Sequence, residues 1–263
     1  VSQIAQPDDA TQLASIVEAA ARTQTPLLTT AGDSKWDWGR GLADTVHNDR
    51  SLGHSTPTQL NLSALSGIVD YEPSELVLVV GAATPLAQIE PLLTEQGQHL
   101  AFEPVHWRST ATAGGTVAVG LAGPRRFRAG SVRDFVLGLQ FVDGKGRLVR
   151  SGGRVVKNVS GFDLWRGLTG SFGSLGLITE VCFKLWPRPE AQCTLLFERP
   201  QLQAASRTML QLAQRQEEIS GLAYVPTQGV VARLEGSASA LQAQTETIAR
   251  DVAVDDRLPH DES

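Results

Sequence analysis

The sequence has few of the residues on which metal, disulfide and thiol chemistry depend. It contains only two cysteines, Cys182 and Cys193, and their spacing fits neither a redox Cys-x-x-Cys motif nor a zinc cluster. Cys182 lies in an apolar run typical of a strand, so we expect a buried thiol. No two His, Asp or Glu residues show the spacing of a metal site. The sequence therefore predicts no metal centre.

Long apolar runs and a strong charge of either sign are also missing. No stretch approaches the roughly 18 apolar residues that span a bilayer, and no signal peptide is visible. The net charge of −5 gives no general attraction to nucleic acid or to an anionic membrane. We therefore expect a cytoplasmic protein without a nucleic-acid partner or a direct membrane span. With 263 residues, the chain can bury a core without disulfide or metal staples.

The first part of the chain alternates strands with few long helices. Strands are predicted at 26–31, in TQLNL, GIVDYE and ELVLVVGAA, and again in HLAFEP and LITEVCFKLWP. Helices are predicted after Pro7–Asp9 and from Pro85 to Gly97. The runs FVLGLQFV and RLVRSG flank DGKG and indicate a hairpin. This mixture favours an α+β fold over a doubly wound sheet.

The pattern changes after Pro187 and Pro189, where we place a domain boundary between residues 1–189 and 190–263. The second part shows β-α-β-β-α order, which is most of a ferredoxin-like unit. We expect no closing strand, because the chain ends in polar DDRLPHDES. Two explanations remain open: the chain is truncated at its C-terminus, or a partner closes the small domain. Its first residue, Val1, is not a methionine either.

Small residues gather in three strand-attached segments: AGDSK after 26–31, ATAGGTVAVGLAG, and KNVSGFDLWRGLTGSFGSLG. Small residues let main-chain N–H groups approach a ligand, and consecutive N–H groups can form an anion nest. None matches GxGxxG or GxxxxGK[ST], so neither a Rossmann site nor a P-loop is indicated. Each alone has a simpler explanation: a surface loop for the first segment, packing of a helix on a sheet for the second, and a surface ion pair for the third. Together they suit one long ligand such as a dinucleotide.

The order of these segments resembles the FAD domain of the vanillyl-alcohol oxidase superfamily, also called PCMH-type. The closer resemblance is to the FAD-binding subunit of bacterial glycolate oxidase. It rests on GGTVAVGLAGPRR, AGSVRDFVLG, GGRVVKNVSGFDL, GSFGSLGLITEV and KLWPRP, and covers about residues 26–190. The resemblance implies a PCMH-type two-subdomain FAD-binding fold followed by an incomplete ferredoxin-like cap domain.

The resemblance also implies a set of FAD-binding residues. The loop AGDSK would hold the pyrophosphate, the AGGT segment would lie near the isoalloxazine, and the main chain of Leu177 and Ile178 would meet the adenine. The first loop has no histidine, which suggests non-covalent FAD. The implied positions are Ala31, Gly32, Asp33, Ser34, Lys35, Pro104, Ala113, Gly114, Gly115, Thr116, Gly120, Gly123, Ser131, Val132, Asp134, Lys157, Asn158, Gly161, Gly176, Leu177 and Ile178.

No residue is assigned a catalytic role from the sequence. His106 could face the flavin, and Arg125 or Arg126 could pair with a substrate carboxylate. A surface histidine, and arginines facing a partner subunit or the cofactor phosphates, are the simpler interpretations.

By resemblance the reaction is oxidation of glycolate, or a similar 2-hydroxy acid, to the 2-oxo acid. The chain would support it beside a related catalytic flavoprotein subunit and an iron–sulfur subunit, which could also bring it to a membrane. The alternatives are a stand-alone FAD oxidoreductase acting on another hydroxy acid or alcohol, and a non-catalytic FAD-fold scaffold.

Overall fold

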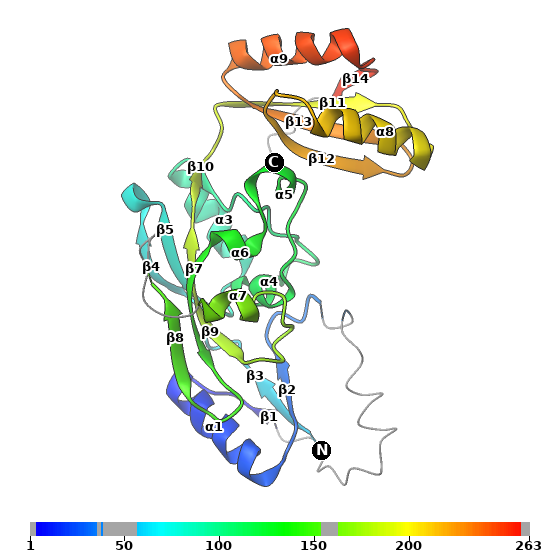
Figure 1. The fold of residues 1–263 in the computed structure, drawn as a ribbon. Helices are drawn as coiled ribbons and strands as arrows, with labels where there is room; N and C mark the ends of the chain where they lie inside the picture. The colour runs from blue at the N-terminus through cyan, green and yellow to red at the C-terminus, as the bar shows by residue number, and fades with distance from the viewer. Residues whose placement is uncertain (1–3, 36–37, 39–56, 154–162, 259–263) are drawn as a thin grey trace. The chain divides into compact units, whose positions relative to one another are not determined.

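The computed structural model describes residues 4–35, 38, 57–153 and 163–258. They form two compact units (Figure 1). Unit 1 consists of residues 1–100, 104–121 and 131–186. Unit 2 consists of residues 101–103, 122–130 and 187–263. Two short segments from the first half of the chain thus belong to unit 2, which the sequence did not indicate. No helix in the described part of the chain has the length and apolar character to cross a bilayer.

Unit 1 begins with a small parallel sheet and one helix. Strands β1 (Ile4–Ala5), β3 (Thr58–Asn61) and β2 (Leu27–Thr30) pair in the order β1-β3-β2. Helix α1 (Ala10–Thr23) starts at Asp9, whose carboxylate accepts from the N–H groups of Thr11 and Gln12. Its apolar side buries Leu13 and Val17 in a cluster with residues of β3. The predicted helix start and strand are confirmed.

The second part of unit 1 is a five-stranded antiparallel sheet in the order β4-β5-β9-β7-β8. Its strands are β4 (Ile68–Glu72), β5 (Val77–Gly81), β7 (Val136–Val142), β8 (Leu148–Gly152) and β9 (Leu177–Lys184). Strand β5 is buried along its whole length, as its continuous apolar run predicts. The predicted hairpin is β7–β8. The buried thiol of Cys182 on β9 is confirmed.

Shorter elements complete unit 1. They are a 3-10 helix (Pro73–Glu75), α3 (Leu86–Glu95), β6 (Gln98–His99), α4 (Ala113–Val119), α6 (Val132–Phe135) and α7 (Leu164–Leu168). Of the predicted HLAFEP strand (residues 99–104), only His99 lies in a strand, β6. The glycine-rich AGGTVAV segment forms helix α4.

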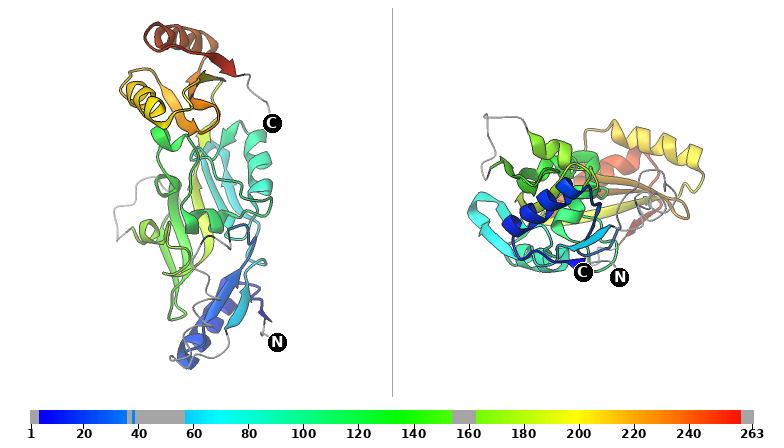
Figure 2. Two further views of the ribbon diagram at one scale, coloured as in Figure 1. Left: turned by 90° about the vertical axis from the view of Figure 1, so that its right-hand side faces the viewer. Right: turned by 90° about the horizontal axis from the view of Figure 1, so that it is seen from below.

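Unit 2 is a four-stranded antiparallel sheet with two helices on one face (Figure 2). After β10 (Trp186–Pro187), its elements are β11 (Ala191–Phe197), α8 (Leu202–Ala213), β12 (Ile219–Val225), β13 (Gly229–Gly236), α9 (Ala238–Asp251) and β14 (Asp256–Leu258); α5 (Arg126–Ala129) comes from the earlier part of the chain. The order β12-β13-β11-β14 is that of a ferredoxin-like unit.

The expectation that no strand follows α9 is wrong. Strand β14 pairs antiparallel with β11, and Leu196 lies opposite Asp256. Its polar sequence hid it, because main-chain hydrogen bonding at a sheet edge does not require an apolar strand.

The sheet face opposite the helices of unit 2 carries four charged residues, called here the charge quartet: Glu103, Arg125, Arg233 and Glu235. Arg233 contacts Glu103 at 2.6 Å and Glu235 at 3.2 Å, and Arg125 pairs with the same two carboxylates. The Arg125 N–H also donates to Glu103 at 2.7 Å. The quartet therefore attaches residues 101–103 and 122–130 to β13.

The quartet also sets the ionisation of Glu103. Burial by itself would raise the pKa of this carboxyl. The hydrogen bonds from Arg233 and from the Arg125 amide, together with both positive charges, outweigh burial and lower the pKa.

Candidate functional site

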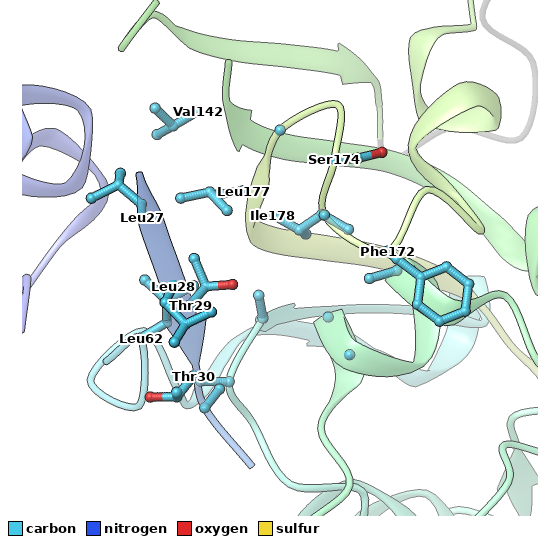
Figure 3. A pocket seen from close by; sticks show the side chains of 18 of the residues that line it. Leu27, Leu28, Thr29, Thr30, Leu62, Val142, Phe172, Ser174, Leu177 and Ile178 are labelled. Atoms are coloured by element: carbon cyan, nitrogen blue, oxygen red, sulfur yellow. The ribbon is translucent and has the colours of Figure 1, made fainter. Parts of the chain in front are cut away.

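Unit 1 contains a cavity of about 850 Å³ between its two sheets (Figure 3). One side is formed by α1, by β2 with the loop that follows it, and by Leu62. The other side is formed by the end of β5, by α4 and by the β7–β8 and α7–β9 connections. The volume is within the range of sites for small molecules and cofactors, about 300–1,000 Å³.

The loop Ala31–Lys35 reaches this cavity directly from β2. Asp33 has φ of 49°, and its carboxylate accepts from the Ala31 N–H at 3.1 Å, which folds the loop back on itself. Gly32 lies very close to the segment that precedes α4 in the chain. A Cβ at Gly32 would stand 1.7 Å from the main-chain oxygen of Thr110. Within the described residues, the N–H groups of Gly32 and Ser34 have no protein acceptor. These amides are available to a ligand.

Lys35 lies at the end of the same loop. Its Nζ is 3.4 Å from the Oγ of Ser34, a side chain that is itself buried. Burial lowers the pKa of Lys35, because the charged ammonium loses solvation. An anion bound beside this ammonium would restore the lost stabilisation.

Helix α4 forms part of the cavity wall with Gly114, Gly115, Ala118 and Val119. Gly114 is packed on β5: its N–H donates to the Ala82 oxygen at 2.7 Å, and a Cβ would stand 2.6 Å from the Ala82 Cβ. Helix–sheet packing thus accounts for Gly114. The same close approach lets the helix present a surface of small residues to the cavity.

The loop between α7 and β9 supplies the third segment. Gly170 and Phe172 donate their N–H groups to the oxygens of Val117 and Ala118, at 3.0 and 2.8 Å. These carbonyls belong to the last turn of α4, where the helix offers them no partner. The loop is therefore fixed to α4, and it lines the cavity with Phe172, Gly173, Ser174 and Gly176, followed by Leu177 and Ile178.

The structure thus brings together the regions of Gly32, Gly114 and Gly176 at one cavity. Eight further positions are described but do not line it: Pro104, Ala113, Thr116, Gly120, Gly123, Ser131, Val132 and Asp134. Lys157, Asn158 and Gly161 lie outside the described residues.

Several of the positions away from the cavity have local roles. Asp134 accepts from the Ser131 N–H at 2.8 Å and so caps α6. Gly120 ends α4 with φ of 72°. Gly123 belongs to unit 2 and donates to the oxygen of Glu103. The Thr116 Oγ1 is buried without a hydrogen-bond partner among the described residues.

Of the apolar end of the cavity, the sequence indicated Leu177 but missed the other residues. Leu27, Leu62, Val142 and Leu177 come from separate strands and loops, and Figure 3 draws them at one end. Val17, Ala20 and Ala21 of α1 lie there as well. Only helical periodicity marked α1, and periodicity does not distinguish a core residue from one lining a cavity.

The described cavity lining holds no histidine, cysteine or arginine, and its ionisable residues are Asp33, Lys35 and Asp143. Burial by itself would raise the pKa of Asp143, but hydrogen bonds from the Arg147 side chain and from the main-chain N–H groups of Arg147 and Lys145, together with the charge of Arg147, outweigh burial and lower the pKa. A carboxylate held in this way is a poor proton acceptor near neutral pH.

The residues suggested for substrate contact have other partners. The Nε2 of His106 lies 2.8 Å from the Oε1 of Glu90, within hydrogen-bond distance, and both side chains are exposed. Arg125 is engaged by Glu103 and Glu235 in the charge quartet. Among the described residues there is also no cluster of three or more potential metal ligands.

The cavity fits FAD on three structural grounds. Its size is adequate, amides without an acceptor among the described residues lie with Lys35 in one loop, and apolar side chains such as Leu27, Val142 and Leu177 line another part. A dinucleotide has the matching features, namely a central diphosphate and terminal aromatic rings.

Comparison with known proteins gives the same ligand class. Residues 1–152 match the FAD binding domain family. The chain is 40% identical over 232 residues to glycolate oxidase subunit GlcE of Escherichia coli, covering 88% of this chain and 62% of that protein. It is 27% identical to a D-lactate dehydrogenase of Archaeoglobus fulgidus, covering 81% of this chain and 45% of that protein.

A solved structure of p-cresol methylhydroxylase with substrate bound superposes with a TM-score of 0.71 at 14% identity, covering 94% of this chain and 55% of that one. This likeness confirms the predicted PCMH-type α+β fold. The chain spans between 45% and 62% of the length of the two relatives named above. Because the family match covers more than half of its residues, the chain belongs to the FAD binding domain family.

Proposed function

We propose that the unit 1 cavity holds FAD non-covalently, with the pyrophosphate against Ala31–Lys35. The observation that carries this proposal is the convergence of three loops, far apart in sequence, on one cavity of about 850 Å³. Free N–H groups at Gly32 and Ser34 suit the phosphate oxygens, since each charge-assisted hydrogen bond contributes about 1.5–3 kcal/mol. The absence of His and Cys from the described lining supports a non-covalent cofactor.

The residues that line the cavity suggest where the two ends of the cofactor lie. The apolar end near Leu27, Val142 and Leu177 suits the adenine ring. The small residues of α4 then lie toward the isoalloxazine, where Gly114 and Gly115 leave room for a flat ring system. Pro104, Thr116 and the other predicted positions that do not line the cavity remain proposals for its surroundings.

We further propose that the chain is the FAD-binding subunit of a glycolate oxidase or dehydrogenase complex. The similarity to GlcE of Escherichia coli supports this assignment. When bound, FAD supplies the hydride acceptor for oxidising a 2-hydroxy acid to its 2-oxo acid. The described lining has neither a histidine to take the hydroxyl proton nor an arginine to pair with the substrate carboxylate, so we place the substrate on a partner flavoprotein subunit. An iron–sulfur subunit would carry electrons onward and could associate the complex with a membrane.

The domain assignment belongs to the same proposal. Unit 1 is the FAD-binding domain, and unit 2 is the cap domain with a ferredoxin-like sheet. The sequence places the boundary at residue 189, close to the last passage from unit 1 to unit 2 at residues 186–187.

The test is an absorption spectrum of the purified chain followed by acid precipitation. Flavin absorption that stays in the supernatant would support non-covalent FAD. A yellow pellet would overturn the non-covalent proposal, and a colourless protein that cannot be reconstituted would favour a scaffold.

Glycolate added under anaerobic conditions then tests whether this chain or a partner subunit oxidises the substrate. The chain alone should keep its flavin oxidised, whereas the assembled complex should reduce it. Rapid reduction of the isolated chain would favour a stand-alone oxidoreductase.

A further inference from the structure

Phe172 is an exposed aromatic residue in the wall of the cavity. Its side chain lines the cavity, yet 54% of its surface is open to solvent. Figure 3 draws its ring at the end of the cavity opposite Leu27. A ligand that covers this ring would remove apolar surface from water, which lowers the free energy of the complex.

The backbone at Phe172 has an uncommon conformation. Its φ is 52°, in the left-handed region that a bulky side chain rarely adopts. The nearby residues Gly170 and Gly173 have φ of 83° and 76°, whereas Ser171 does not have a positive φ. Glycine would satisfy this geometry at position 172 with less strain, and the sequence nevertheless has phenylalanine there.

Contacts with α4 hold Phe172 in this conformation. Its N–H donates to the Ala118 oxygen at 2.8 Å, and the Gly170 N–H donates to Val117 at 3.0 Å. Both bonds satisfy carbonyls at the end of α4, so the turn is fixed before any ligand arrives. The side chain is thereby held at the cavity wall that Ala118 and Val119 also form. Strained residues of this kind cluster at ligand sites.

We propose that Phe172 positions the cofactor by packing its ring against bound FAD on the solvent side of the cavity. The inference rests on the proposal that FAD occupies this cavity. Ring packing removes apolar surface from water and excludes solvent from the cofactor, so its main effect is slower FAD dissociation.

The experiment replaces the ring and measures FAD release from the full chain. Phe172→Gly should raise the dissociation rate about tenfold, which corresponds to the loss of one aromatic contact. Its apoprotein should unfold at the same or a higher temperature than wild type, because glycine relieves the left-handed strain. Phe172→Trp should restore slow release.

Leu175→Ala is the matched control. Leu175 belongs to the same loop and is 59% exposed, but it does not line the cavity. Its replacement should leave FAD release unchanged.

The outcomes separate the two proposals. Wild-type protein that binds no FAD would refute the cavity assignment itself. Wild-type binding with an unchanged release rate in Phe172→Gly would refute the role of Phe172 alone. Release from Phe172→Trp as fast as from Phe172→Gly would also overturn it, since an aromatic ring would then make no difference.

Discussion

Gly32→Ala tests the contact between the first cavity loop and the segment that precedes α4. The added Cβ would stand 1.7 Å from the Thr110 oxygen. Close carbon–oxygen contacts lie at about 3.3–3.6 Å, so one of the two segments must shift by about 1.6 Å. Overpacking of this kind costs about 1–3 kcal/mol.

The shift should affect both stability and FAD binding. The free energy of unfolding should fall by the overpacking cost, and the midpoint temperature should fall by about 2–4 °C per kcal/mol. FAD affinity should fall about 5-fold to 150-fold if the same energy opposes the bound loop conformation. Thermal unfolding of the apoprotein and titration with FAD measure the two effects separately.

Gly167→Ala is the control for this prediction. A Cβ at Gly167 meets nothing within 4 Å, and the residue lies inside α7. Alanine should stabilise this helix by about 0.5–1 kcal/mol and leave FAD binding unchanged. If Gly32→Ala kept wild-type stability and wild-type FAD affinity, the reasoning from close packing would be refuted.

The remaining predictions concern charge. Glu235→Gln should destabilise the protein by about 2 kcal/mol or more in urea unfolding, because it leaves Arg125 and Arg233 short of a partner; an unchanged urea midpoint would contradict the quartet. Because the folded-state pKa of Glu103 is lowered, its contribution to stability is complete above the usual pKa of about 4.3 and is lost as the pH falls through the lower folded value; Glu103→Gln should remove this part of the acid sensitivity in denaturation at stepped pH. Because the pKa of Lys35 is lowered, the apoprotein loses this positive charge at a lower pH than free lysine does. FAD affinity should therefore weaken as the pH rises toward about 10.4, the usual pKa of lysine. Lys35→Met should flatten the pH profile of FAD titrations, and an unchanged profile would place the pyrophosphate elsewhere.

Much of unit 1 could be predicted because its signals are local. The apolar run of β5, the turn residues between β7 and β8 and the Asp9 cap each act within a few residues. The three cavity loops could be found for a similar reason, since small residues follow or precede strands. The presence of three such segments in one domain suggested a single long ligand, and the family resemblance identified this ligand as FAD.

The missed features depend on contacts between distant residues. Glu103 and Arg125 belong to unit 2 because they pair with Arg233 and Glu235 on β13, and no local motif marks such pairs. Strand β14 was missed because its polar residues form an edge by main-chain bonding. Phe172 was overlooked because its importance lies in its left-handed backbone, which a sequence does not display.

The charge quartet has a consequence for how the protein is made. Arg125 and Glu235 are separated by 110 positions in the chain. Residues 104–121 therefore leave the ribosome long before residues 101–103 and 122–130 can pair with β13. Until Arg233 and Glu235 have emerged, Glu103 and Arg125 have only each other as quartet partners. The segments before and after residues 104–121 therefore reach their final partners only after synthesis has passed β13. A polypeptide cut at residue 189 would lack the two residues of β13 that hold these segments.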